Sequence, residues 1–130
     1  MLFRSELATK LRESGKLNKV FTGDFLKLQP EGFAKYDGVI MNPPFGTSEQ
    51  EIIHLTHALK FLKPDGWLLA IMPAGVEFRE TAKATAFRKL IHDCEGWMAD
   101  LPAGSFSSVG THVNTVLVGI GVSRSYASYF

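Results

Sequence analysis

The chain has 130 residues, which is enough for one modest hydrophobic core and too few for two independent domains. We therefore expect a single domain spanning residues 1–130. Hydrophobic residues make up 45% of the chain and charged residues 21%, and this ordinary balance argues against disordered and collagen-like classes. The net charge of +1 lacks the basic excess of most nucleic-acid-binding domains, so any DNA binding by this chain alone should be weak.

The sequence also indicates in which cellular compartment the protein is found. Its longest apolar stretch, Trp67 to Met72, is far too short to cross a bilayer. Charged residues interrupt the first turns of the chain at helical spacing, which argues against a secretory signal. Cys94 is the only cysteine, so an intrachain disulfide and a thiolate metal cluster are excluded, and we expect its side chain in the core. We predict a cytoplasmic protein without a membrane or metal partner.

The hydrophobic pattern predicts strands that alternate with helices. In the first half we expect a helix over 2–14, strands over 20–22 and 37–41, and a helix after a capping box at Ser48 and Glu51. A turn over 63–66 and a strand over 67–72 follow. The last part should hold a helix over 77–94, with Cys94 facing inward, and strands over 97–101 and 113–122. This order predicts a three-layer α/β sandwich with a mostly parallel sheet. No helix separates the last two strands, so the final strand should be antiparallel.

The motif that carries chemistry is Asn42-Pro43-Pro44-Phe45, placed directly after a hydrophobic strand. Ligands of open α/β sheets sit at the carboxyl ends of strands, where this loop is expected. The Asn42 side-chain oxygen and the Pro43 carbonyl can both accept hydrogen bonds from an exocyclic amino group. The prolines stiffen the loop, and Phe45 can stack on a flat base. The alternative is a strand-ending turn with an aromatic plug.

Longer segments share a common resemblance. The stretch from Asp37 to Gly46 resembles the catalytic motif of amino-methyltransferases that act on adenine N6, cytosine N4, a glutamine amide or an RNA guanine. The stretch 61–73 resembles the helix end and strand that follow in that family. The stretches 101–106 and 110–115 resemble the final hairpin of DNA adenine methyltransferases. The resemblance covers roughly residues 18 to 122 and implies a truncated, Rossmann-like methyltransferase sandwich.

The resemblance also implies a cofactor, S-adenosylmethionine. Asp24 and Phe25 resemble the strand end at which the acidic side chain accepts from the adenine amino group of the cofactor while the aromatic ring packs on the adenine. Asp24 alternatively caps local backbone amides in a turn.

One part of the family pattern is missing ahead of the Asn-Pro-Pro motif. Gly15 is followed by Lys16-Leu17-Asn18 and lacks the Gly-x-Gly spacing that lets a backbone approach the cofactor. In the family, the strand that carries this turn lies beside the strand over 39–41. We therefore expect that apolar strand to be a sheet edge, which recruits a second copy, a complementary chain or the first helix.

Other candidate residues are weaker. His54 and His57 lie three apart on a helix without a third metal ligand, so a polar helix face is the simpler interpretation. Arg79 either belongs to a solvated helix start or contacts a phosphate. Ser105 to Ser108 either contact a DNA backbone or form a polar loop. We expect the two tryptophans in the core.

Two functions are therefore compatible with the sequence. The first is the catalytic half of a DNA adenine-N6 methyltransferase, inactive alone, in which Asn42, Pro43 and Phe45 hold a flipped adenine. The second is a catalytically silent binding module, such as a phage- or plasmid-encoded inhibitor or regulator of a host protein, for example a defence nuclease.

Overall fold

The computed structural model describes residues 25–32, 35–44, 47–102 and 114–129. The chain divides into two compact units, residues 1–34 and 35–130, and each is described by itself. In the first unit the short 3-10 helices η1 (Phe25–Lys27) and η2 (Pro30–Gly32) are described. The predicted helix over 2–14 and strand over 20–22 lie outside the described residues.

The second unit contains a four-stranded sheet. Its strands are β1 (Tyr36–Met41), β2 (Leu62–Pro73), β3 (Trp97–Asp100) and β4 (Thr115–Ile120), in the order β1-β2-β4-β3. β1 pairs with β2 in parallel, and β4 is antiparallel to both β2 and β3. β1, β2 and β3 therefore run in one direction. This arrangement confirms the predicted α/β class, with a mostly parallel sheet and an antiparallel final strand.

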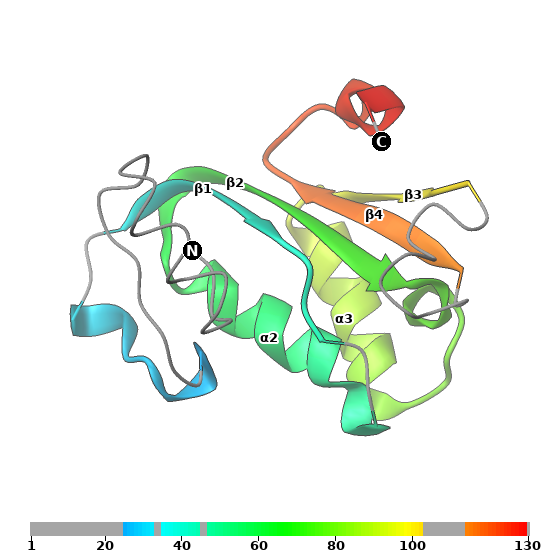
Figure 1. Ribbon diagram of the computed structural model, residues 1–130, viewed down its shortest axis with the longest axis horizontal. Coiled ribbons are helices and arrows are strands. Elements are labelled where there is room, and N and C mark those ends of the chain that lie inside the picture. Colours follow the sequence, from blue (N-terminus) through cyan, green and yellow to red (C-terminus); the bar gives the residue numbers. More distant parts are fainter. Residues whose placement is uncertain (1–24, 33–34, 45–46, 103–113, 130) are drawn as a thin grey trace, which may run out of the picture. The chain divides into compact units, whose positions relative to one another are not determined.

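Two helices cover one face of this sheet. α2 (Gln50–Leu59) and α3 (Ala82–Asp93) lie together on that face (Figure 1). They bury an apolar core against alternate residues of β2 and β4, because successive side chains of a strand point to opposite faces. Its fully buried side chains include Leu55, Phe61, Leu68, Met72, Val116 and Val118.

The opposite face of the sheet carries a smaller apolar cluster. Leu69, Leu101 and Leu117 are buried there, and the two tryptophans, Ile71, Val122 and Ala127 pack against them. Ala127 belongs to η6 (Arg124–Tyr129), a 3-10 helix that follows β4. The described residues thus supply a helical layer on one face, whereas the sequence predicted three layers.

The predicted start of β2 is wrong. The strand begins at Leu62, which pairs with Tyr36, while Trp67 already pairs with Gly38. Residues 63–66 therefore bulge out of the ladder, and the charged side chains in this bulge are exposed. The predicted turn over 63–66 is thus a bulge within β2, and the ladder continues on both sides of it.

The predicted start of the last helix is also wrong. After β2 comes a 3-10 turn, η4 (Ala74–Glu77), and α3 begins only after Thr81, whose side chain accepts from the Ala84 amide. Cys94 caps the end of α3 and is exposed, not buried. The helix ends at Asp93, so Cys94 does not continue the buried face of α3.

The predicted capping box at the start of α2 does not form. The residue that caps α2 is Glu49, in a left-handed conformation, and it makes no side-chain cap hydrogen bond. Ser48 lies outside the helix in the preceding turn, η3 (Thr47–Glu49), also with positive φ. The Glu51 side chain is buried and pairs with Arg79 instead of capping the helix. This pair is part of the candidate site.

Candidate functional site

The candidate site lies at one edge of the sheet. Because β1, β2 and β3 are parallel, their carboxyl ends meet at this edge, where open α/β sheets bind ligands. Asn42 directly follows β1, and η4 directly follows β2. The Ala74 amide donates to the carbonyl of Asn114, 2.8 Å away, and so ties the end of β2 to the residue that precedes β4.

The loop after β1 presents alternate residues to solvent. Asn42 and Pro44 are exposed, whereas Pro43 between them is buried. A buried proline with fixed φ anchors the loop, and the neighbouring Asn42 side chain remains accessible to a ligand. Of the predicted site residues, these three are described together, at the expected edge of the sheet.

The other predicted site residues are described only in part. Phe25 begins η1 in the unit of residues 1–34, where its side chain is half-buried. Asp24, Phe45 and the segment 105–108 lie outside the described residues. Their assigned roles therefore stay predictions.

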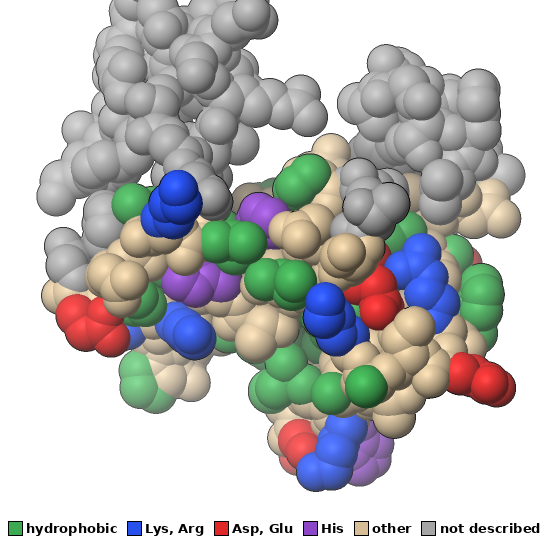
Figure 2. All heavy atoms as spheres, turned by 90° about the horizontal axis from the view of Figure 1, so that it is seen from below, with side chains coloured by type: hydrophobic (Ala, Val, Ile, Leu, Met, Phe, Trp, Pro, Cys, Tyr) green, Lys and Arg blue, Asp and Glu red, His purple; other side chains and the backbone are tan. Residues whose placement is uncertain are grey.

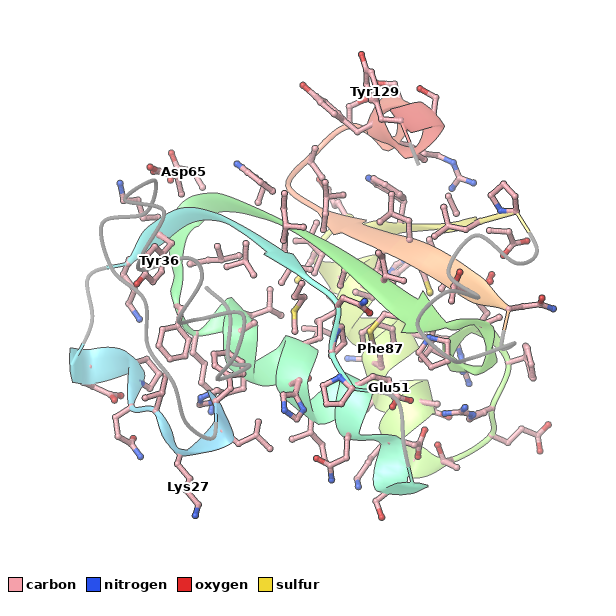
Figure 3. All side chains as sticks on the ribbon, viewed as in Figure 1. Lys27, Tyr36, Glu51, Asp65, Phe87 and Tyr129 are labelled. Carbon is pink, nitrogen blue, oxygen red and sulfur yellow. The ribbon has the colours of Figure 1, made fainter. Side chains whose placement is uncertain are left out.

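An ion pair that is buried on its acidic side joins the segments that follow β1 and β2. The Arg79 Nη1 atom donates to Glu51 Oε1 over 3.1 Å, and the Glu51 side chain is only 1% exposed. Glu51 Oε2 is also buried and has no hydrogen-bond partner among the described residues. Figure 3 shows Glu51 at the start of α2, toward the end of the sheet where β1 and β2 finish.

Sequence reasoning missed this pair. The spacing of Glu51 from Ser48 predicts a helix cap, and the position of Arg79 predicts a helix start or a phosphate contact. The two residues lie 28 positions apart, so only the packing of α2 against the segment after β2 brings them together. An acidic residue in the first turn of a helix is common, so the sequence offered no signal for a buried partner.

A pair of carboxyl groups lies at the same edge. Burial raises the pKa of the Glu77 carboxyl, and a hydrogen bond and charge repulsion from Asp100 raise this pKa further, while Arg124 lowers it. Glu77 ends η4 after β2, and Asp100 ends the parallel strand β3. The two carboxyl groups lie close together because β2, which leads into η4, and β3 finish at the same edge of the sheet.

Charge on the described surface is mixed. Figure 2 shows Lys and Arg side chains scattered among apolar and acidic ones on the face seen there, without a continuous basic patch. This distribution gives DNA no extended electrostatic footprint on that face.

The two histidines of α2 have ordinary protein contacts. His54 Nδ1 lies 2.8 Å from the carbonyl of Gln50, one turn earlier. The His57 ring packs edge-on against Phe61, with 5.3 Å between ring centroids. Within the described ranges, no three His, Cys, Asp or Glu side chains are grouped as metal ligands.

No helix in the described part of the chain has both the length and the apolar character needed to span a membrane.

Solved structures with the same arrangement identify the architecture. The M protein of the type I restriction enzyme EcoKI is 24% identical, with a TM-score of 0.61 over 80% of this chain. The fold is similar to part of a methyltransferase subunit. The methyltransferase subunit of a type I restriction-modification system from Streptococcus thermophilus is 22% identical, with a TM-score of 0.64 over 80% of the chain. A chain from a structure of type I restriction-modification complex assembly and conformational transition is 25% identical, with a TM-score of 0.61 over 79%.

The methyltransferase likeness is partial in length. This chain covers 24%, 25% and 28% of those three chains, about a quarter of each. By sequence, no protein family and no curated protein matches it. The shared fold therefore supports the predicted methyltransferase resemblance, while the activity and partners of the longer subunits do not transfer automatically.

Proposed function

We propose that this chain supplies the base-holding half of a DNA adenine-N6 methyltransferase and works with a partner that completes the cofactor site. The observation that carries this proposal is the loop at the carboxyl end of β1, where Asn42 is exposed and Pro43 is buried. An accessible acceptor on an anchored loop suits the capture of an amino group, because little ordering is needed when the ligand arrives.

The proposed chemistry needs two hydrogen-bond acceptors. Asn42 Oδ1 and the Pro43 carbonyl would each accept one hydrogen of the adenine amino group and turn the nitrogen lone pair toward the methyl donor. Phe45 would stack on the flipped base. This step requires no covalent nucleophile and no metal.

S-adenosylmethionine would supply the methyl group when bound. Its fit to these residues is partial: Phe25 offers a half-buried ring, but no Gly-x-Gly turn precedes the Asn-Pro-Pro motif in this sequence. Without such a turn the backbone cannot approach the methionine part of the cofactor closely. We therefore assign methyl transfer to an assembly and derive no transfer step from this chain alone.

The sheet offers a place for the partner. β1 is a terminal strand of the described sheet, and Ile40 on it is 61% exposed. An edge strand with an exposed apolar side chain is a template for pairing with another strand. A second copy or a complementary chain that carries the glycine-rich turn would pair here.

The net charge of +1, without a basic excess for DNA, favours a second candidate function. This is a catalytically silent module that keeps the fold as a binding surface, such as an inhibitor or regulator of a host protein. It predicts the same partner at β1 but neither cofactor nor adenine recognition.

The first test is calorimetric titration of the purified chain with S-adenosylmethionine and with its demethylated product, while the oligomer mass is measured in the same sample. Saturable micromolar binding that is lost in Asp24→Ala would support a cofactor site completed by a second copy. A folded chain that fails to bind at millimolar ligand has no autonomous transfer activity.

The base-holding role has its own test. A labelled single-stranded oligonucleotide containing one adenine is compared by fluorescence anisotropy with the same strand containing purine, which lacks the amino group. Two lost hydrogen bonds of about 1 kcal/mol each predict roughly tenfold or more weaker binding of the purine strand. Asn42→Ala should remove this preference, whereas Gln29→Ala, which truncates another exposed amide, should keep it. Equal binding of both strands by the wild type would favour the silent module.

A further inference from the structure

The turn before α2 and the first turn of α2 are joined to the segment after β2 by a set of polar contacts. These contacts connect the turn before α2 with the residues that precede and begin α3. They are Arg79 Nη1 to Glu51 Oε1 (3.1 Å), Arg79 Nη1 to Glu49 Oε2 (3.9 Å), Thr81 Oγ1 to Glu49 Oε2 (2.9 Å) and Lys83 Nζ to the Ser48 carbonyl (3.0 Å). We call this set the clasp.

Glu51 is the buried member of the clasp. Its side chain is 1% exposed, while that of Arg79 is 37% exposed. A buried carboxylate without a partner is costly, and Arg79 is the partner that Glu51 has in this structure. Oε2 of Glu51 retains unused acceptor capacity, since no described residue donates to it. A carboxylate placed this way is unusual in a part of the protein that serves only for packing.

The clasp holds a strained turn. Ser48 has φ 64° and Glu49 has φ 54°, so two consecutive non-glycine residues adopt the left-handed conformation. This conformation is unfavourable for a residue with a side chain and persists only where its surroundings hold it. Both residues are contacted by the clasp, through the Ser48 carbonyl and the Glu49 carboxylate. This turn lies between the Asn42 loop and α2.

Neighbouring residues fix the position of Arg79. Its guanidinium lies against Gly75, where an added Cβ would be 2.5 Å from Nε. Arg88 donates to the carbonyls of Val76 and Arg79, at 2.9 and 2.8 Å. The Arg79 side chain therefore reaches Glu51 from a rigid segment at the end of β2, and its charge is already matched by two carboxylates. A phosphate contact would have to compete with both.

We propose that Glu51, held by Arg79, is a positioning residue that sets the place of the Asn42 and Pro43 acceptors at the carboxyl edge of the sheet. Glu51 acts through the turn and does not touch the reacting atoms. This inference rests on the proposed base-holding function. It extends that function by naming a residue pair, outside the Asn-Pro-Pro motif, that controls the selectivity of the site for an amino-bearing base.

The test compares Glu51→Gln with Glu80→Gln. Both replace a carboxylate by an amide, but Glu80 is exposed and lies beside Arg79 in the sequence. The first readout is hydrogen exchange in the ligand-free protein. We expect amides over 48–53 to exchange about tenfold faster in Glu51→Gln, with β4 amides unchanged, because the opening is local. Glu80→Gln should match the wild type.

The second readout is the preference for the adenine strand over the purine strand. Glu51→Gln should lower this preference severalfold at unchanged fold, and Arg79→Lys, which keeps the charge, should retain part of it. Should Glu51→Gln prove too unstable to compare, Arg79→Lys and Arg79→Gln provide the same comparison from the other side of the pair.

The outcomes separate the inference from the function on which it rests. Unchanged exchange over 48–53, or uniformly faster exchange in every strand, would overturn the positioning role. Unchanged base preference in a protein with faster local exchange would also overturn it. If the wild type shows no base preference, the proposed function fails, and local exchange then decides whether the clasp holds the turn.

Discussion

The indole of Trp67 lies directly over Gly38, its partner across the β1–β2 ladder. A Cβ built on Gly38 would lie 2.1 Å from Trp67 Cε2, so no larger residue fits without movement. Trp97 covers Gly119 of β4 in the same way. Each tryptophan thus fills the space that a glycine leaves on its neighbouring strand.

The Trp67–Gly38 contact predicts that Gly38→Ala destabilises the protein by about 1–3 kcal/mol, the usual cost of overpacking a filled site. Urea unfolding measures the change. Adding Trp67→Leu to Gly38→Ala should recover part of the loss, because the smaller side chain vacates the space over Gly38. A double variant that simply sums the two single losses would show that the contact is not the cause.

The Glu51–Arg79 pair predicts a loss of stability when only one partner is removed. Arg79→Ala leaves the buried carboxylate without its partner, and we expect about 3 kcal/mol of destabilisation, at the low end of the range because water reaches Arg79. Replacing both residues by methionine should cost much less, since no buried charge remains. Chemical denaturation of the three proteins checks this order, and equal losses in the single and double variants would contradict it.

The raised pKa of Glu77 predicts a pH dependence. The folded protein holds this proton more tightly than the unfolded chain, so stability from this group is fully present below the ordinary pKa of 4.5 and is lost as pH rises through the raised pKa. At neutral pH, Glu77→Gln should therefore be more stable than the wild type, and the fall above pH 4.5 should shrink. Thermal unfolding of both proteins from pH 4 to 8 measures this pH dependence. Exposed Glu80→Gln is the control, and an identical pH profile for both variants would refute the assignment.

The exposed apolar side chain on β1 predicts an association surface. Ile40→Lys places a charge on the edge strand, which should lower self-association or partner binding while changing stability by less than about 0.5 kcal/mol. Analytical ultracentrifugation over a concentration series checks the mass. Phe78→Lys, which removes another exposed hydrophobic side chain, should leave the mass unchanged. Equal association of wild type and Ile40→Lys would exclude β1 as the interface between copies.

Exposure of Asn42 predicts that function and stability separate at this residue. Asn42→Ala should change the free energy of unfolding by less than about 0.5 kcal/mol, as a surface substitution does, yet lose the preference for an adenine strand. Pro43→Ala, in contrast, should lower the free energy of unfolding, because Pro43 is buried and its ring restricts the unfolded chain. Calorimetric unfolding of both variants distinguishes the two residues.

The sequence was informative where chemistry is local. The apolar run before two prolines located β1 and the exposed Asn42, and the absence of a helix between the last strands predicted the antiparallel β4. Boundaries failed where tertiary contacts overrode local spacing. The turn chemistry of residues 63–66 became a bulge inside β2, and Glu51 left its expected cap for a buried partner.

By itself, the sequence determined the class of the sheet and the loop that offers hydrogen-bond acceptors, because periodicity, proline geometry and amide chemistry act over a few neighbouring residues. Only the tertiary structure decided which distant side chains meet. The pairing of Glu51 with Arg79, of Glu77 with Asp100 and of Trp67 with Gly38 depends on which strands lie side by side and end at the same edge. No local pattern encodes those contacts, since they arise only when folding brings segments far apart in the sequence side by side.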